Sequence, residues 1–188
     1  MVQRLTAHLH LYRPMKERYL FLDFDGVLNT SSYQQYLREK GEKTSDGFGP
    51  LFDPAAVQAL GKILEAIQDA VIVIISSWKD IHGFVGIREM WIERDLPGSV
   101  YAVTPSTMND DLLVANLADP ESFRQVEGST KGKEIAVWMA GHDALEEPFV
   151  IIDDNDRFLP WQREHVVKTN PEVGLTAADA EKAIRLLK

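Results

Sequence analysis

Short apolar runs alternate along this chain with longer segments in which apolar side chains recur every three or four positions. The first pattern is typical of buried strands, because a short continuous run has no polar face to turn towards water. The second is typical of helices with one apolar face. Strands are therefore expected at Tyr19–Phe24, at Val71–Ile75, in the run SVYAV around Tyr101, at Phe149–Ile152 and in the short run HVVK that ends at Lys168.

Helices are expected between these strands. Asp53 followed by Pro54 is typical of a helix start, since an aspartate caps the first N–H groups and a proline fits the first turn. Thr176, with Asp179 three positions on, is typical of a capping box. Together with the apolar spacing, these signals predict helices around Tyr33–Lys40, from Asp53 through Ile67, roughly over Ile81–Arg94, over Lys131–Met139 and after Thr176.

The alternation of strands and helices predicts an α/β fold, a parallel sheet with helices on both faces. In such a sheet, ligands bind beyond the carboxyl ends of the strands. The side chains that follow each strand are therefore the first place to look for chemistry.

Length and local composition indicate one folded unit with small additions. The 188 residues suffice for a single domain with a well-developed core. We expect residues 1–18 to form an N-terminal extension and residues 19–188 a single domain. Within that domain, the polar and glycine-rich residues 29–52 are expected to form a flap region, and the polar residues 105–128 an insertion.

Composition and charge exclude several classes of function. Twenty lysines and arginines against 29 acidic residues give a formal charge of −9, which argues against a nucleic-acid binder held by general electrostatics, although not against a local basic groove. The absence of cysteine excludes disulfides, zinc–thiolate sites and a thiol nucleophile. No apolar run approaches the roughly 20 residues that span a bilayer, and the first residues lack the apolar core of a secretory signal. We therefore expect no membrane contact and a cytoplasmic location.

Acidic and hydroxyl side chains follow three of the expected strands. They are Asp23 and Asp25 after the first, Ser76 and Ser77 after the second, and Asp153, Asp154 and Asp156 after the strand that ends at Ile152. Crowded carboxylates repel one another unless a cation or a shared proton compensates. Because an all-oxygen cluster suits Mg²⁺, the sequence predicts a magnesium site at this edge of the sheet.

A positive charge is available from Lys131 and Lys133 in the first turn of an expected helix. The helix macrodipole disfavours cations at that end, so a lysine there is more easily explained if it meets an anion. A carboxylate nucleophile, a second acid, a hydroxyl, a lysine and Mg²⁺ together suit phosphoryl transfer. Attack of the carboxylate on phosphorus gives an aspartyl-phosphate, while the metal and the lysine screen the repulsion between the two anions.

Four segments carry a resemblance to a known family. "FLDFDGVLNT", "VIVIISS", "STKGKEI" and "FVIIDDNDRF" resemble, in order and type, the four motifs of the haloacid dehalogenase (HAD) superfamily. The chain is more narrowly similar to the small HAD domains associated with RNA-repair proteins, through "SSWKD" and "TNPEVGLT". The resemblance implies a Rossmann-like fold with a minimal cap, built of small insertions only.

The resemblance also implies roles for the first motif. Asp23 matches the nucleophile and a metal ligand. Asp25 matches the general acid and base, which protonates the leaving group and later activates water, and its backbone carbonyl would also bind the metal. Since the dehalogenase branch lacks this second acid, Asp25 favours phosphate chemistry over halide displacement.

The other three motifs supply phosphate and metal contacts. Ser76 matches the phosphate-binding hydroxyl, with Ser77 as the alternative, and Lys131 matches the motif lysine, with Lys133 as the alternative. In the fourth motif, Asp154 matches the remaining metal ligand, and Asp153 orients Asp154 or shares its role. Asp156 is expected to support these residues without binding the metal itself. Of the four tryptophans, Trp78 is the one expected near this site, while the others are expected to pack in the core or at its rim.

The function expected from these features is a Mg²⁺-dependent phosphatase that hydrolyses a phosphomonoester through an aspartyl-phosphate. Residues 29–52 are too few for a full cap, so the site is expected to be open. The partner is then a phosphorylated small molecule or nucleotide, or a nucleic-acid end processed by a polynucleotide phosphatase. A non-catalytic HAD-like binding domain is a further alternative, and the same intermediate can pass to an acceptor other than water.

Overall fold

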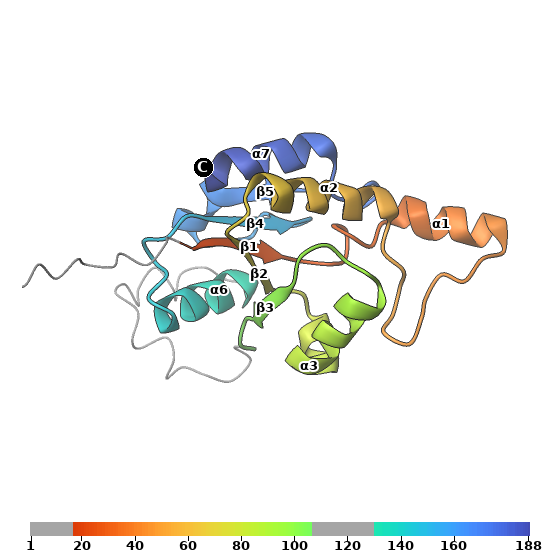
Figure 1. Ribbon diagram of the computed structural model, residues 1–188, viewed down its shortest axis with the longest axis horizontal. Coiled ribbons are helices and arrows are strands. Elements are labelled where there is room, and N and C mark those ends of the chain that lie inside the picture. The colour runs from red at the N-terminus through yellow and green to blue at the C-terminus, as the bar shows by residue number, and fades with distance from the viewer. Residues whose placement is uncertain (1–16, 107–129) are drawn as a thin grey trace, which may run out of the picture.

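A five-stranded sheet, all of whose strands are parallel, forms the centre of the computed structural model, which describes residues 17–106 and 130–188 (Figure 1). The strand order is β3-β2-β1-β4-β5, so β1 lies in the middle between β2 and β4. The strands are β1 (Arg18–Leu22), β2 (Ala70–Ile74), β3 (Val100–Val103), β4 (Phe149–Asp153) and β5 (Val166–Lys168).

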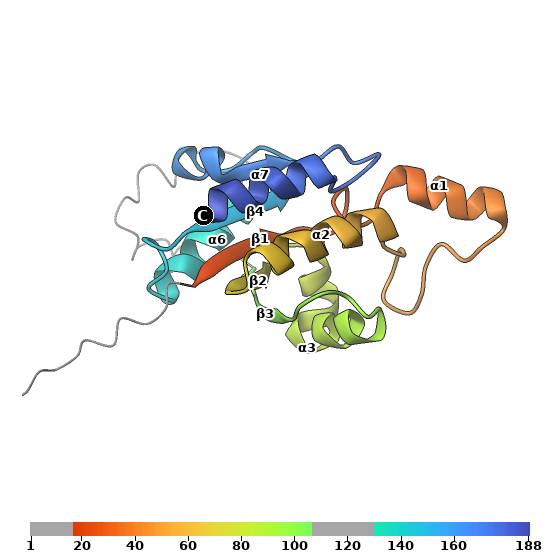
Figure 2. The same cartoon turned by 45° about the horizontal axis from the view of Figure 1, so that its top comes forward.

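Helices cover both faces of the sheet, as the sequence predicts. Figures 1 and 2 show α2 and α7 side by side on one face and α6 on the other. The helices are α1 (Ser31–Lys40), α2 (Pro54–Ala66), α3 (Trp78–Glu93), α6 (Thr130–Gly141), the 3₁₀ helix η1 (Pro160–His165) and α7 (Ala177–Leu187). No helix in these described ranges is long and apolar enough to cross a bilayer.

Alternate side chains of the central strand enter two separate cores. Leu20 and Leu22 of β1 pack in the core under α2, α3 and α7, whereas Tyr19 and Phe21 pack in the core under α6. This division follows from the period of two along a strand. Because both faces are buried, the strand reads in the sequence as one continuous apolar run.

The expected strands and helices are all present, and their ends differ in informative ways. β1 ends at Leu22 instead of Phe24, because the Phe24 carbonyl accepts hydrogen bonds from the N–H groups of a tight turn at Val27, Leu28 and Asn29. α3 begins at Trp78, before the expected Ile81, and it is kinked at a non-helical Gly83. The 3₁₀ helix η1 has no counterpart among the predicted elements.

The flap region contains one helix and one loop. α1 is capped by Thr30, whose hydroxyl accepts the N–H of Tyr33 at 3.2 Å, and a loop of residues 41–53 leads from it to α2. Figure 2 shows α1 extending beyond the sheet. The two other additions expected from the sequence, residues 1–18 and 105–128, fall almost entirely outside the described residues.

The loop between β5 and α7 supports the turn that follows β1. Thr169 Oγ1 donates to the carbonyl of Gly26 at 2.7 Å, and the N–H of Leu175 donates to the carbonyl of Val27 at 2.8 Å. Gly174 lies so close to this turn that a Cβ there would be 2.3 Å from the Val27 carbonyl oxygen. The turn carrying the first-motif acids is therefore held by residues near the other end of the domain.

This contact predicts a stability difference between two glycine substitutions. Gly174 and Gly41 have similar left-handed backbones, with φ of +66° and +69°, but nothing lies within 4 Å of a Cβ built on Gly41. Gly41→Ala should therefore lose only the cost of that conformation, about 1 kcal/mol of unfolding free energy. Gly174→Ala should lose about 2–4 kcal/mol, because it adds a steric clash. Urea unfolding of both variants measures the difference, and equal losses would contradict it.

Candidate active site

Two acids meet where β1 and β4 end. The strands pair in register, Leu22 opposite Ile152, so the residues that follow them lie side by side. Asp23 donates its backbone N–H to the carbonyl of Ile152 at 3.0 Å, and Asp153 is the last residue of β4. Both carboxylates are buried, with Asp23 4% exposed and Asp153 fully enclosed. The two acids are therefore fixed by the sheet itself and not by a flexible loop.

Lys131 lies between these carboxylates. Its Nζ is 2.6 Å from Asp23 Oδ2 and 2.7 Å from Asp153 Oδ2. The lysine comes from the first turn of α6, where the helix dipole alone would disfavour it. The two anions account for its position. Of the two lysines that the motif leaves open, Lys131 is the one seen to bridge these acids.

The two serines after β2 have different environments. Ser76 is fully buried, and a hydrogen bond from its hydroxyl lowers the pKa of Asp23, although burial outweighs this effect. Ser77 is exposed and stands at the N-cap of α3 without a side-chain capping bond. The structure thus brings Ser76, and not Ser77, to the nucleophile candidate.

The electrostatics of the cluster disfavour having both carboxylates ionised. Burial raises the pKa of Asp23, and the nearby Lys131 ammonium only partly opposes this. Burial, followed by the charge of Asp23, raises the pKa of Asp153 to about 7. Burial alone would lower the pKa of Lys131, but the two carboxylates raise it above its usual value. One ammonium faces two buried carboxylates, so a further cation would be favourable here.

A third carboxylate completes an oxygen site of the kind that Mg²⁺ prefers. Oxygens of Asp23, Asp153 and Asp154 all lie within 4.8 Å of one another. The turn after β1 closes tightly on this site, since a Cβ at Gly26 would be 2.6 Å from Asp154 Oδ2. Hard carboxylate oxygens, and two buried carboxylates that face a single ammonium, both fit a magnesium ion.

The remaining acid of this segment is turned elsewhere. Asp156 is exposed, and its Oδ2 accepts a hydrogen bond from Lys168 Nζ at 2.8 Å. Asp153, in contrast, is oriented by the backbone N–H of Asn155, which donates to its Oδ1 at 2.8 Å.

Asp25 lies on the exposed side of the turn. Its Oδ1 accepts Asn29 Nδ2 at 2.8 Å and its Oδ2 accepts Trp78 Nε1 at 3.0 Å. From the sequence, Trp78 is expected near the site but is given no role there, and Asn29 is not identified as a site residue. Asn29 stands four positions after Asp25, and its place in the first motif is the only signal that could have drawn attention to it.

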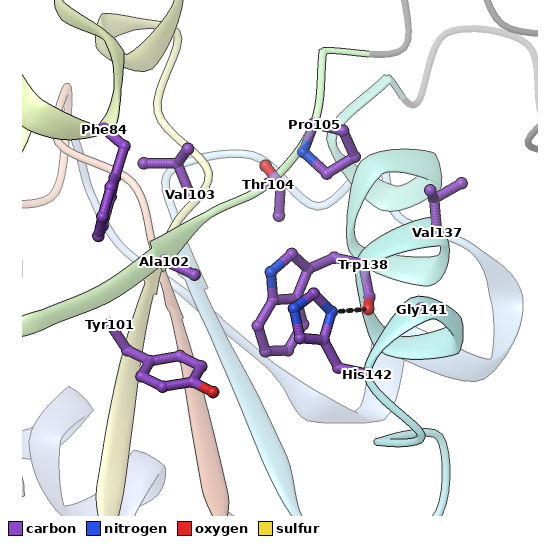
Figure 3. Close-up of a pocket in the computed structure, with 10 residues that line it drawn as sticks. All are labelled: Phe84, Tyr101, Ala102, Val103, Thr104, Pro105, Val137, Trp138, Gly141 and His142. Carbon is purple, nitrogen blue, oxygen red and sulfur yellow. Dashed lines mark hydrogen bonds between the residues drawn. The ribbon is translucent and has the colours of Figure 1, made fainter.

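A separate groove lies between β3 and α6, away from these acids. It has a volume of about 510 Å³ and is lined mainly by apolar side chains (Figure 3). The one histidine in it, His142, is stacked on the Trp138 ring at 4.1 Å, and its Nδ1 is 2.7 Å from the Trp138 carbonyl. None of the clustered carboxylates lines this groove, so the acidic edge of the sheet is the better candidate for chemistry.

Comparison with known proteins agrees with the motifs and the fold. A family model described as the HAD domain in Swiss Army Knife RNA repair proteins matches residues 19–180. A search of curated proteins gave no match. HAD domains are typically hydrolases, most of them phosphatases, and they generally use Mg²⁺. Because the match spans most of its length, this chain belongs to the family of HAD domains found in Swiss Army Knife RNA repair proteins, and its five-stranded parallel sheet is consistent with a HAD domain.

Proposed function

We propose that this chain is a Mg²⁺-dependent phosphatase that hydrolyses a phosphomonoester through a phosphorylated Asp23. The observation that carries the proposal is the position of Asp23, fixed at the end of the central strand between Lys131 and Ser76. A nucleophile needs this rigidity, because catalysis depends on holding reacting atoms in the correct geometry. Asp23, Asp153 and Asp154 would hold the Mg²⁺, together with the backbone carbonyl of Asp25.

The first half-reaction transfers the phosphoryl group to the protein. The Asp23 carboxylate attacks phosphorus, and the bond between phosphorus and the ester oxygen breaks. Asp25 gives its proton to that oxygen, so the alcohol leaves neutral. Lys131 and the Ser76 hydroxyl bind the phosphate oxygens, and a Mg²⁺ held by the clustered carboxylates would add positive charge that reduces the repulsion between the nucleophile and the phosphate.

The second half-reaction returns Asp23 to its initial state. Asp25, now ionised, takes a proton from water as the water oxygen attacks phosphorus. The bond between phosphorus and the Asp23 oxygen breaks, and inorganic phosphate leaves. An acceptor alcohol in place of water would make the same chain a phosphotransferase. Asp25 can serve both steps because its side chain is exposed, so a leaving group and then water can reach it.

A polynucleotide end is the second candidate substrate. It is favoured by the family description, which names RNA repair, and by the exposed position of Asp25. In the described part of the chain, α1 and the loop 41–53 are the only cover inserted after the first motif, so a large substrate has room to approach. A phosphorylated metabolite or free nucleotide remains the alternative, and the net charge of −9 offers no general attraction for nucleic acid.

A substrate panel decides among these proposals. Phosphate release should be measured with aryl phosphates, nucleotides and 5′- or 3′-phosphorylated oligonucleotides, each with and without Mg²⁺. Turnover of oligonucleotide ends well above that of nucleotides would support end processing, and the reverse result would reject it. Failure of every substrate, together with failure to bind beryllium fluoride as an aspartyl-phosphate mimic, would favour a non-catalytic binding domain.

Asp23→Asn should separate activity from folding. The substitution removes the attacking oxygen, so kcat should fall by at least about a thousandfold. In the absence of metal, the unfolding free energy at neutral pH should not fall. Burial raises the pKa of Asp23, so its ionised carboxylate destabilises the folded state, and its charge also raises the pKa of Asp153. Phosphate release and urea unfolding measure the two effects. Retained activity would show that Asp23 is not the nucleophile.

Mg²⁺ should stabilise the protein through Asp154. A ligand at a hundred times its Kd stabilises the native state by about 2.7 kcal/mol. We expect Asp154→Asn to weaken Mg²⁺ binding by at least about tenfold, since it removes one of the clustered carboxylates. Asp156→Asn is the matched control, because its carboxylate is exposed and paired with Lys168. Thermal unfolding over a Mg²⁺ titration gives the affinities, and an equal loss in both variants would contradict this site.

A further inference from the structure

Neither carboxylate oxygen of Asp25 can turn without losing a hydrogen bond. Asn29 Nδ2 holds Oδ1 at 2.8 Å, and Trp78 Nε1 holds Oδ2 at 3.0 Å. Asn29 belongs to the same turn as Asp25, so its hydrogen bond is local. Trp78, in contrast, is the first residue of α3, which follows β2. The indole contact therefore ties the exposed carboxylate to the strand end that carries Ser76.

The indole ring is itself held on several sides. Trp78 is 7% exposed, and Phe24 meets it edge-on with ring centroids 5.5 Å apart. Phe52 lies 5.7 Å away by the same measure, and the Arg94 guanidinium 5.6 Å from the ring centroid. A ring packed in this way cannot change rotamer without moving its neighbours.

The loop 41–53 forms one wall of this packing. Arg94 holds the loop through Asp46, with N–O distances of 2.9 and 2.7 Å, and through the Gly49 carbonyl at 3.1 Å. The loop approaches so closely that a Cβ at Gly49 would lie 2.9 Å from Cη2 of Trp78. The loop 41–53 thus affects Asp25 indirectly, because it packs against the indole ring that donates a hydrogen bond to Asp25.

We propose that Trp78 is a positioning residue for proton transfer by Asp25, and that the loop 41–53 acts through it. This inference rests on the proposed role of Asp25 as general acid and base. An indole N–H donates and never accepts, so Oδ2 always presents a lone pair to it. While both hydrogen bonds persist, the proton that Asp25 carries is confined to the remaining lone pairs, which restricts the directions in which it can be given to a leaving group. Misplacement of a catalytic group by about 1 Å costs up to a hundredfold in rate.

The test compares two substrates that differ in their need for a proton. Phenyl phosphate has a poor leaving group that requires a general acid, whereas the 2,4-dinitrophenolate of 2,4-dinitrophenyl phosphate leaves as a stable anion without one. The ratio kcat/KM is the quantity to follow, because it reports steps up to departure of the leaving group. Trp78→Phe keeps an aromatic ring but removes the donor. We expect it to lower kcat/KM about tenfold for phenyl phosphate and less than twofold for the dinitrophenyl ester.

Trp91→Phe is the matched control. Trp91 lies on the same helix and is 3% exposed, and its ring is 6.3 Å from that of Phe24. Its Nε1 donates to the Pro97 carbonyl at 3.2 Å, away from the acids. This variant should change kcat/KM by the same factor for both substrates. A similar equal loss in Trp78→Phe would reduce Trp78 to a packing role and overturn the inference. Absence of turnover in the unmodified protein would instead overturn the proposed function.

A measurement independent of activity tests the contact itself. The chain has four tryptophans, so ¹⁵N-labelled protein should give four indole N–H signals, of which Trp78→Phe identifies one. Asp25→Ala should shift that signal and speed its exchange with solvent, because the hydrogen bond at 3.0 Å is lost. The Trp138 and Trp161 signals should stay in place. An unchanged Trp78 signal would overturn the inference whatever the activity.

Discussion

The register between β1 and β4 places Asp23 and Asp153 side by side, and the rest of the site depends on this pairing. Two buried carboxylates at adjacent strand ends repel each other, and the backbone cannot separate them because both strands are hydrogen-bonded in the middle of the sheet. Relief must therefore come from positive charge or from a bound proton, and burial together with the charge of Asp23 raises the pKa of Asp153. Lys131 supplies part of the positive charge from α6, on one face of the sheet, and the incomplete compensation makes the place attractive to a cation.

The fold provides the stiffness that this arrangement requires. The central strand is packed on both faces, with Leu20 and Leu22 in one core and Phe21 in the other. A close-packed interior resists small displacements, so the strand end cannot yield to the repulsion between the acids. The exposed acid, Asp25, lies outside this packing and gains its order from Asn29 and Trp78 instead. Two carboxylates two positions apart are thus held by different physical means.

Much of this could be predicted from the sequence, and the limits have physical causes. Carboxyl ends of parallel strands share one edge, so Asp23, Ser76 and Asp153 could be brought together from the apolar runs alone. Lys131 could be added from its unfavourable place at a helix start. The contact between Asp25 and Trp78 could not, because it joins residues 53 positions apart and depends on a rotamer set by the packing of other aromatic rings. The end of β1 at Leu22 could not be predicted either, because the hydrogen bonds of the following turn determine it and hydrophobicity does not.

The support that the β5–α7 loop gives to the turn after β1 has a consequence for how the domain forms. Thr169 reaches back across 143 positions to bind the carbonyl of Gly26. Contacts of such long range close late in folding, because a large loop must be ordered before they form. During synthesis, the first-motif acids leave the ribosome long before the residues that hold their turn. The central strand is thus made early, but the turn at its carboxyl end takes its final shape only when nearly the whole domain has been translated.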